Sequence, residues 1–244
     1  MSKVAYGIFV VAFVIHCATA KGLPSFLKLC KRKDPNLHNC IIENVELLRP
    51  KLKQGVPELF IPPLDPLVIP EATLNSGAQF KATFKDIQMY NTDNFDLKSF
   101  DVDLDKHHIN VKILFPLLRI KSIYNINGRL LVLNLDGKGP ADGNYTNVEA
   151  SLALKGTPFH KNNKEYVSWE KEKIDINIGK INLLFERLFG DNKELNERTN
   201  KVINENIDTI IGELQPVIQQ VVSDFVFNLV NRIFAKYALS ELFL

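Results

Sequence analysis

The stretch ELNERTNKVINENIDTIIGELQPVIQQVVSDFVFNLVNRIFAKY, residues 194–237, decides the fold. Its apolar residues recur every three or four positions, which is the period of an α-helix with one buried face. A helix of this length would be about 66 Å long, whereas a compact chain of this size has a radius of gyration of about 17 Å. The sequence therefore predicts an elongated molecule and a bend at Pro216. The periodic residues are Ile203, Ile207, Ile210, Ile211, Leu214, Ile218, Val221, Val222, Phe225, Leu229, Val230 and Ile233.

The apolar stripe of this helix widens after Pro216. The residues that widen it are Val217, Val221, Val222, Phe225, Val226 and Phe227. Because they cover much of the helix circumference, we expect this half to be wrapped by other elements on more than one side.

Residues 73–185 show a period of two, which is typical of strands with one wet and one buried face. Three runs illustrate it: 109–115, 148–154 and 174–178 place apolar residues at alternate positions. Clusters of Gly, Pro and Asn at 136–144 and 156–163 are typical of turns. No helical pattern separates the strands, which excludes a βαβ architecture. The prediction is an α+β fold, with a strongly curved antiparallel sheet wrapped around one long C-terminal helix.

Residues 21–70 form a shorter helical zone followed by a strap. Asp34-Pro35 is a helix start signal, apolar residues from Leu37 to Leu52 keep helical spacing, and Gly55 ends the run. Pro50 is expected to kink the last turn. The proline-rich segment 61–70 predicts an extended arm.

Residues 1–20 have the features of a secretory signal peptide. Lys3 precedes the apolar run 4–15, and the segment ends in Ala18-Thr19-Ala20, an A-x-A cleavage pattern. The run is too short to span a bilayer, which needs about 20 residues. Cleavage leaves residues 21–244, which we expect to form a single domain of a secreted, soluble protein without stable membrane insertion.

The cysteine count supports export. Cys17 lies in the signal peptide, which leaves Cys30 and Cys40 as an even pair in an oxidising compartment. We expect a disulfide between them; the alternative is two free buried thiols. Asn144-Tyr145-Thr146 is an N-x-T sequon, so Asn144 is a candidate glycosylation site.

Charge and motifs exclude several classes of function. Lysine and arginine total 30 against 28 acidic residues, so there is no basic excess for binding nucleic acid. The mature histidines, His38, His107, His108 and His160, are scattered, and we interpret them as surface residues. His107 and His108 are adjacent, so on a strand they face opposite sides and cannot bind one metal ion together. We expect no enzyme, no metal site and no cofactor.

The chain resembles the takeout and juvenile-hormone-binding proteins of insects. The resemblance covers essentially the whole mature chain, through the close cysteine pair, Pro62-Pro63-Leu64-Asp65-Pro66-Leu67, the run 124–130 followed by Gly137-Lys138-Gly139, and Leu188-Phe189-Gly190-Asp191 before the terminal helix. It implies a tubular lipid-binding fold, or super-roll. Hormone-binding members carry a second disulfide, and no cysteine follows Cys40, so the chain looks more like the takeout branch. Takeout relatives imply roles in circadian, feeding or chemosensory signalling.

Together these patterns predict a monomeric carrier that buries a terpenoid, a juvenile-hormone-like molecule or a fatty acid in an apolar tunnel. For each candidate lining residue, ordinary core packing is the alternative. Tyr124 and Trp169 carry an O–H and an N–H that could orient one polar group of the ligand. The rival function is a secreted interaction protein with a closed core that acts through a receptor. The candidates are Phe84, Phe100, Phe115, Tyr124, Leu131, Leu133, Trp169, Ile211, Ile218, Val222 and Phe225.

Overall fold

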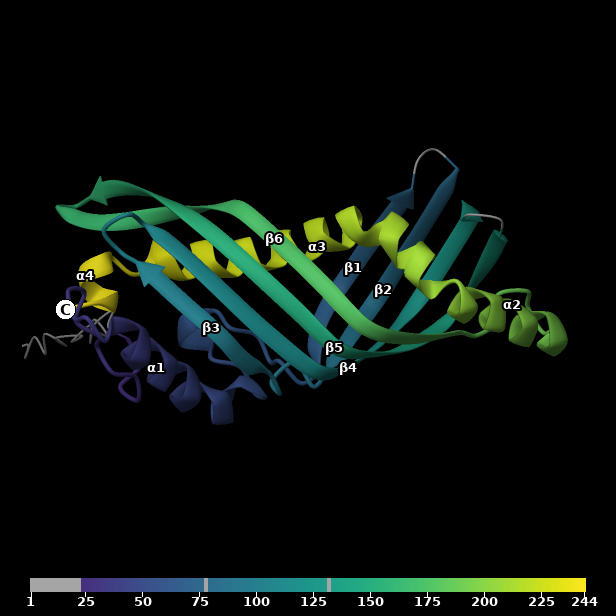
Figure 1. The fold of residues 1–244 in the computed structure, drawn as a ribbon, viewed down its shortest axis with the longest axis horizontal. Coiled ribbons are helices and arrows are strands. Elements are labelled where there is room, and N and C mark those ends of the chain that lie inside the picture. The colour runs from purple at the N-terminus through teal and green to yellow at the C-terminus, as the bar shows by residue number, and fades with distance from the viewer. Residues whose placement is uncertain (1–22, 77–78, 131–132) are drawn as a thin grey trace, which may run out of the picture.

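The computed structural model describes residues 23–76, 79–130 and 133–244. Its centre is a six-stranded antiparallel sheet in the order β1-β2-β4-β5-β6, with β3 also pairing with β4. Three strands run along the molecule: β4 (His108–Leu130), β5 (Leu133–Lys161) and β6 (Lys164–Phe185). β3 (Asp96–Asp103) pairs with the first half of β4, whereas β2 (Phe80–Tyr90) pairs with its second half and carries β1 (Leu67–Ser76) on its other edge. The predicted curved antiparallel sheet is confirmed (Figure 1).

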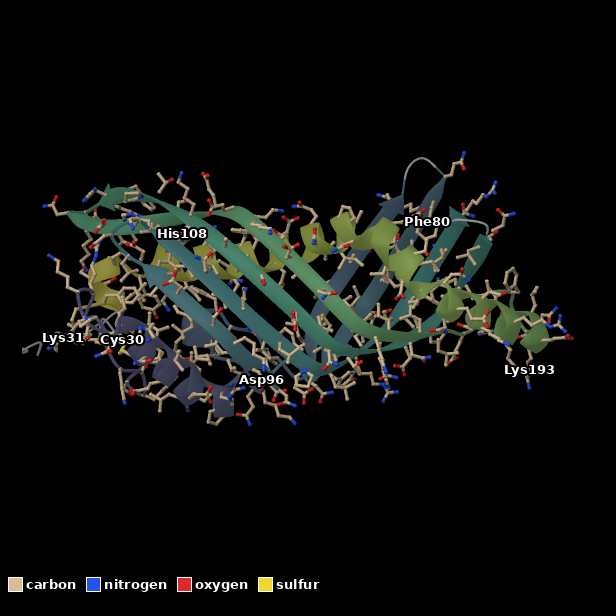
Figure 2. The ribbon with its side chains drawn as sticks, viewed as in Figure 1. Cys30, Lys31, Phe80, Asp96, His108 and Lys193 are labelled. Carbon is tan, nitrogen blue, oxygen red and sulfur yellow. A yellow bond between two sulfur atoms is a disulfide. The ribbon has the colours of Figure 1, made fainter. Side chains whose placement is uncertain are left out.

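The molecule is elongated, as the helix length predicted. In Figure 2, Cys30 and His108 lie at one end, and Phe80 and Lys193 lie toward the other. The signal peptide, residues 1–20, lies outside the described residues.

The turns predicted at 136–144 and 156–163 are wrong, except at Asn162–Asn163. β5 continues through both clusters, and only Asn162 and Asn163, with φ angles of 52° and 59°, form the turn to β6. β5 is hydrogen-bonded on both sides, to β4 and to β6, and this pairing outweighs the weak strand propensity of Gly and Asn. Gly137 serves close packing instead: a Cβ there would lie 2.5 Å from the carbonyl oxygen of Leu188.

A row of three residues crosses the long strands and divides the sheet. Pro116, Asn147 and Gly179 stand opposite one another without ladder pairing, and Asn147 has a φ of 52°. Pro116 has no N–H to donate to the neighbouring strand. One unpaired residue in each of the three strands shifts, by one position, which side chains point inward and which point outward. As a result Tyr145 and Val148, three residues apart, contact the same interior cluster. We call Pro116, Asn147 and Gly179 the transverse row.

The C-terminal segment forms two helices rather than one. α2 (Lys193–Glu205) ends at Asn206, whose side-chain amide donates to the carbonyl of Val202 at 2.8 Å, and α3 (Ile207–Lys236) follows. α3 continues through Pro216 without interruption, and the bend expected there stays a prediction. α3 runs beside β6, from the α2 end of the tube to the opposite end (Figure 1).

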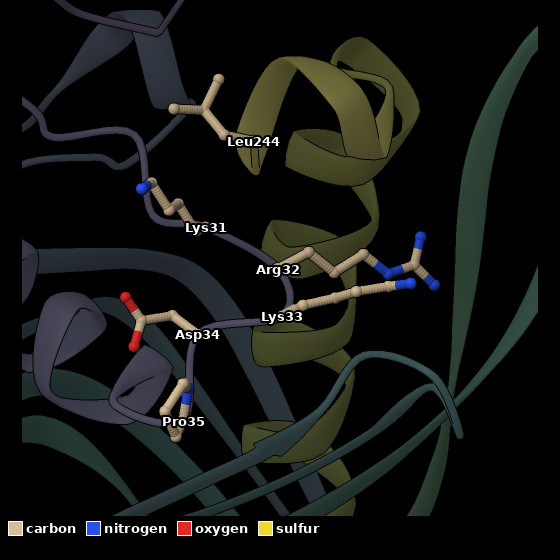
Figure 3. A pocket seen from close by; sticks show the side chains of 6 residues that line it. All are labelled: Lys31, Arg32, Lys33, Asp34, Pro35 and Leu244. Carbon is tan, nitrogen blue, oxygen red and sulfur yellow. The ribbon is translucent and has the colours of Figure 1, made fainter.

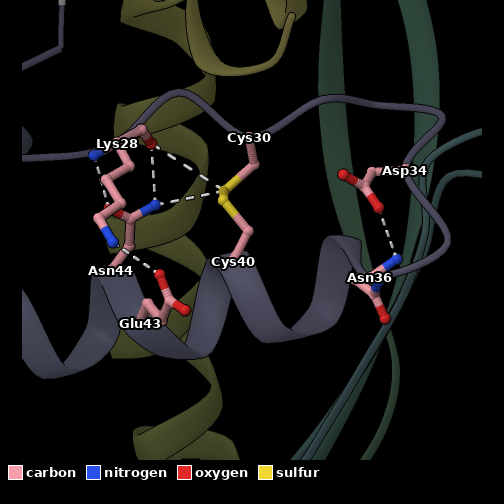
Figure 4. Close-up of a disulfide and its surroundings, with 7 residues drawn as sticks. All are labelled: Lys28, Cys30, Asp34, Asn36, Cys40, Glu43 and Asn44. Atoms are coloured by element: carbon pink, nitrogen blue, oxygen red, sulfur yellow. Dashed lines mark hydrogen bonds and ion pairs between the residues drawn. A yellow bond between two sulfur atoms is a disulfide. The ribbon is translucent and has the colours of Figure 1, made fainter.

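The first described residues and the C-terminus lie together at one end of the tube. α1 (Leu37–Leu52) contains Pro50 and is followed by a 3₁₀ turn, Pro57–Leu59, while α4 (Leu239–Leu242) closes the chain. The arm predicted over 61–70 is only partly confirmed: 61–64 form no helix, Asp65 and Pro66 make a turn with a cis peptide bond, and β1 begins at Leu67. The Cys30–Cys40 disulfide is present, with a Cα–Cα distance of 5.8 Å (Figure 4). The amide of Leu244 donates to the carbonyl of Cys30 at 2.8 Å, which ties the C-terminus to this disulfide.

Candidate ligand-binding interior

The half of the tube nearer α2 has a densely packed core. Tyr124 belongs to it and is fully buried, with its hydroxyl donating a 2.6 Å hydrogen bond to the carbonyl of Glu186. Burial, and then the charge of Glu186, raise the pKa of Tyr124 to about 12. This hydroxyl is bonded to the protein's own backbone, so it is not free to orient a ligand. The core residues are Phe80, Ala82, Tyr124, Ile126, Leu135, Phe185, Leu188, Ile203, Ile207, Ile210 and Leu214.

In the other half of the tube, which we call the open half, a smaller share of the apolar side chains is completely buried. Two clusters lie there: one around Leu118, Val148 and Ile176, and one around Ile109, Leu154, Val167, Trp169 and Leu239. The apolar side chains that pack against these two clusters come from strands and from α3. Each of them is only half-buried. Inward-facing apolar side chains that keep accessible surface are available for contact with a bound molecule. These half-buried residues are Phe100, Val102, Val111, Phe115, Tyr145, Leu152, Ile174, Ile178, Ile218, Val222, Phe227, Val230 and Phe234.

The predicted lining residues are divided between the two halves. Phe84 and Ile211 pack against the dense core, where Tyr124 also lies, and Ile218 contacts both the core and the open half. Phe225 is half-buried and lies outside these clusters of buried residues. Leu131 and the side chain of Leu133 lie outside the described part of the chain. The open half contains Phe100, Phe115, Trp169, Ile218 and Val222.

Trp169 is fixed in place within the open half. The side-chain amide of Asn231 on α3 accepts from its backbone N–H at 2.8 Å and donates to its carbonyl at 2.9 Å. Its ring meets Phe234 edge-on, with centroids 5.2 Å apart. Only 2% of Trp169 is exposed, and its indole Nε1 has no hydrogen-bond partner among the described residues. The Trp169 Nε1–H is therefore an unpaired donor enclosed in an apolar cluster.

Sequence reasoning missed Tyr145. In the sequence, Tyr145 is recognisable only as the middle residue of a sequon that adjoins a predicted turn. The structure places Asn144 and Tyr145 in β5, with Asn144 exposed and Tyr145 packed against the inward cluster of Leu118, Val148 and Ile176. Simple alternation from Val148 would have put residue 145 outside, and the only hint in the sequence was Pro116, which cannot pair in the neighbouring strand.

The histidines are partly enclosed rather than uniformly at the surface. His38 and His160 are exposed as predicted. His107 is half-buried with its Nε2 3.5 Å from a Glu165 carboxylate oxygen, whereas Nε2 of His108 lies 2.7 Å from Glu172. The adjacent histidines therefore contact different carboxylates. Within the described residues there is no group of three or more His, Cys, Asp or Glu side chains that could hold a metal ion.

Two surface pockets lie outside the apolar interior. One of about 650 Å³ is lined by residues 31–35 and Leu244, beside the disulfide (Figure 3). The other, of about 400 Å³, lies between the end of β6 and α2. None of the predicted lining residues contributes to either. Among the helices that the structure describes, none is long and apolar enough to cross a membrane.

A curled antiparallel sheet whose apolar face packs on one long helix defines the fold class of this protein. A family model for the haemolymph juvenile hormone binding protein (JHBP) matches residues 8–244. The chain belongs to this family.

Two relatives are named circadian clock-controlled protein daywake. The one from Drosophila melanogaster is 27% identical over 236 residues, which cover 92% of this chain and 89% of the relative. The one from Drosophila yakuba is 26% identical, with the same coverage. The crystal structure of Takeout 1 from Epiphyas postvittana has a TM-score of 0.73 at 18% identity, and the match covers 88% of this chain and 98% of that one. At this identity the structural match establishes the fold.

Proposed function

We propose that the protein is a secreted carrier that encloses a small lipophilic ligand between the inner face of its sheet and α3. The observation that carries this proposal is the half-buried state of the inward-facing apolar residues of the open half. Burying about 300 Å² of apolar ligand surface there would contribute roughly 7 kcal/mol before the costs of association. Membership in a family of carriers supports the same role.

The test is the thermal stability of delipidated, folded mature protein in the presence of ligand. A C16 fatty acid and a sesquiterpenoid ester serve as probes, and glucose serves as the water-soluble control. A ligand at one hundred times its dissociation constant adds about 2.7 kcal/mol to the free energy of unfolding, so the melting temperature should rise with probe concentration. A melting temperature that no lipid raises would reject the carrier and favour the rival, a closed-core protein acting through a receptor.

We infer secretion from the predicted signal peptide and from the N-x-T sequon at Asn144. We propose that the mature chain begins at Lys21 and carries a glycan on Asn144, which is exposed on β5. Intact mass of protein from an insect expression system, before and after glycosidase treatment, tests both points. A monomer is expected, which light scattering of the same sample measures.

The names of the relatives support a time-of-day role for the carried ligand. Transcript and protein levels sampled through a light–dark cycle and then in constant darkness test it. Levels that stay flat in both conditions would reject this part of the proposal.

A further inference from the structure

Three chain segments form the end of the tube that carries the disulfide, and we call this surface the disulfide end. Arg32 connects the three, because its Nη1 lies 3.0 Å from Oε2 of Glu165 on β6 and its backbone N–H donates to the carbonyl of Leu244 at 2.7 Å. Figure 1 shows the tip of the β5–β6 hairpin and the C-terminus at this same end. The segments are residues 28–35, residues 157–168 of the hairpin and residues 239–244.

The β5–β6 hairpin projects beyond β4 and carries two aromatic side chains on its outer face. The pairing of β5 with β4 ends at Lys155, so residues 157–168 form a two-stranded ribbon that β4 does not accompany. Phe159 is 42% exposed, and its ring stacks on that of Tyr166 with centroids 5.7 Å apart. Val167, the next residue along β6, is buried in the interior, so Tyr166 points to the opposite side. The Phe159 ring therefore presents apolar surface to the outside.

Two leucines add apolar surface to the disulfide end. Leu29 is 45% exposed beside the buried Cys30, and Leu244 is 66% exposed. Single apolar side chains on a protein surface are ordinary. Three large ones, contributed by three segments that meet at one end of the molecule, indicate contact with an apolar partner.

Three lysines at the disulfide end are exposed and form no ion pair with any residue that the structure describes. They are Lys31, Lys33 and Lys161. Figure 3 shows Lys31 and Lys33 in the surface pocket that Leu244 also lines. Lys161 lies at the tip of the hairpin, directly before the turn to β6.

Most of the acidic side chains at this end are already paired within the protein. Glu165 pairs with Arg32 at 3.0 Å, and Glu241 pairs with Lys164 at 2.8 Å. Asp34 forms no ion pair with a described residue, and its Oδ1 accepts a backbone N–H at 2.8 Å. The charge that remains, three lysines against Asp34 and the C-terminal carboxylate, is positive.

Exposed apolar side chains beside unpaired lysines match the chemistry of an anionic bilayer surface. The interfacial region of a bilayer accepts aromatic side chains, and anionic headgroups attract lysine within a Debye length. Interfaces between proteins, by contrast, are depleted in lysine. A lipid surface therefore fits this end better than a protein partner does.

We propose that the disulfide end docks reversibly on the surface of an anionic lipid bilayer. The three exposed apolar side chains enter the interfacial region, and the three lysines lie among the headgroups. The open half lies directly behind this end, since Leu239 belongs to the same cluster as Trp169 and Phe243 packs against it. Resting on the carrier function proposed above, docking would shorten the path of a lipophilic ligand between the bilayer and the open half.

Vesicle co-sedimentation of delipidated mature protein tests the docking without any carried ligand. The vesicles contain phosphatidylcholine alone or with about 30% phosphatidylserine. The wild type should bind the mixed vesicles, and this binding should fall when NaCl rises from about 50 to 500 mM. The triple variant Lys31→Ala, Lys33→Ala, Lys161→Ala should bind about 100-fold more weakly, because each lysine near such a surface contributes about fivefold.

A matched control variant removes the same charge elsewhere on the sheet. Lys81→Ala, Lys138→Ala and Lys180→Ala change exposed positions on β2, β5 and β6, and together they should leave vesicle binding within about threefold. Phe159→Ser should weaken binding about 10-fold through the loss of apolar contact. Leu184→Ser, at a 48% exposed position beside α2, should not weaken it.

The outcomes separate the docking from the carrier function. Equal losses in the two triple variants would show attraction by net charge alone and overturn the docking site. Folded wild type that binds neither kind of vesicle would overturn it too, while the carrier function is decided separately by lipid-dependent melting. Vesicle binding without any lipid-dependent rise in melting temperature would support the docking and remove the ligand path. A dimer in light scattering that Phe159→Ser dissociates would assign this end to a second copy of the chain and overturn the bilayer.

Discussion

Asn231 on α3 holds Trp169 on the edge strand β6 by both of its backbone polar groups, at 2.8 and 2.9 Å. Asn200 and Asn204 on α2 do the same for Phe185 and Leu183. An edge strand presents unpaired N–H and C=O groups, which must be satisfied when they are covered. Asparagine side-chain amides on α2 and α3 form these hydrogen bonds with β6. The helices therefore cover this edge of the sheet without another strand.

Replacing Asn231 with Ala should lower the free energy of unfolding by about 1–3 kcal/mol, because two backbone groups of a buried residue lose their partner. Asn228→Ala is the matched control, since Asn228 is exposed on the same helix, and it should stay within about 0.5 kcal/mol of the wild type. Urea unfolding measures both. Equal effects of the two substitutions would contradict the role of Asn231.

The Cys30–Cys40 disulfide closes a loop with a sequence separation of 10. In the chain-entropy model its removal costs about 2.5–3 kcal/mol. The double variant Cys30→Ala, Cys40→Ala should show this loss in urea unfolding without changing lipid binding, because the disulfide lies outside the clusters of the open half. Two alkylatable thiols in secreted wild-type protein would show that the pair is not formed in solution.

Leu214 and Phe225 lie on the same helix but in different surroundings. Leu214 is 7% exposed in the dense core, so Leu214→Ala should cost about 2–5 kcal/mol. Phe225 is only half-buried, and Phe225→Ala should cost less. Chemical unfolding of both variants tests this ranking. A neutral Leu214→Ala would mean that α3 does not pack inside the sheet.

Asp65 ties the proline-rich strap to the turn after β2. Its Oδ1 accepts from the backbone N–H of Asn91 at 3.1 Å, and Lys53 lies 3.2 Å from Oδ2. The Asn91 hydrogen bond first, and then Lys53, hold the pKa of Asp65 below its ordinary value, against the opposing effect of burial. A lowered folded-state pKa gives stability that is present above the ordinary aspartate pKa, near 3.9, and is lost as the pH falls through the folded value.

The free energy of unfolding of the wild type should therefore exceed that of Asp65→Asn at pH 6, and the difference should shrink as the pH is lowered toward 3. Asp136→Asn, at an exposed position, is the control and should show no such trend. A difference that is constant with pH would mean that the charge of Asp65 does not contribute.

Much of the fold could be predicted because it depends on local periodicity. The 3.6-residue period of 194–237 specified helix and an elongated shape, and the two-residue period of 148–154 specified a strand with its buried face. The Cys30–Cys40 pair followed from counting cysteines after removing the signal peptide. The helix and the strand are specified by side chains within one segment. The disulfide follows from the number of cysteines, whatever the tertiary contacts around them.

What only the tertiary structure decided depends on partners distant in sequence. Gly137 and Gly139 stay in a strand because β5 has neighbours on both sides, whereas the sequence alone favoured a turn. Tyr124 was expected to face a ligand, yet the backbone of Glu186, 62 residues away, takes its hydroxyl. Tyr145 faces inward because the transverse row shifts the alternation in adjacent strands together. A periodic pattern records which residues are apolar, but the pairing of separate segments fixes which polar groups find a partner and which remain unpaired.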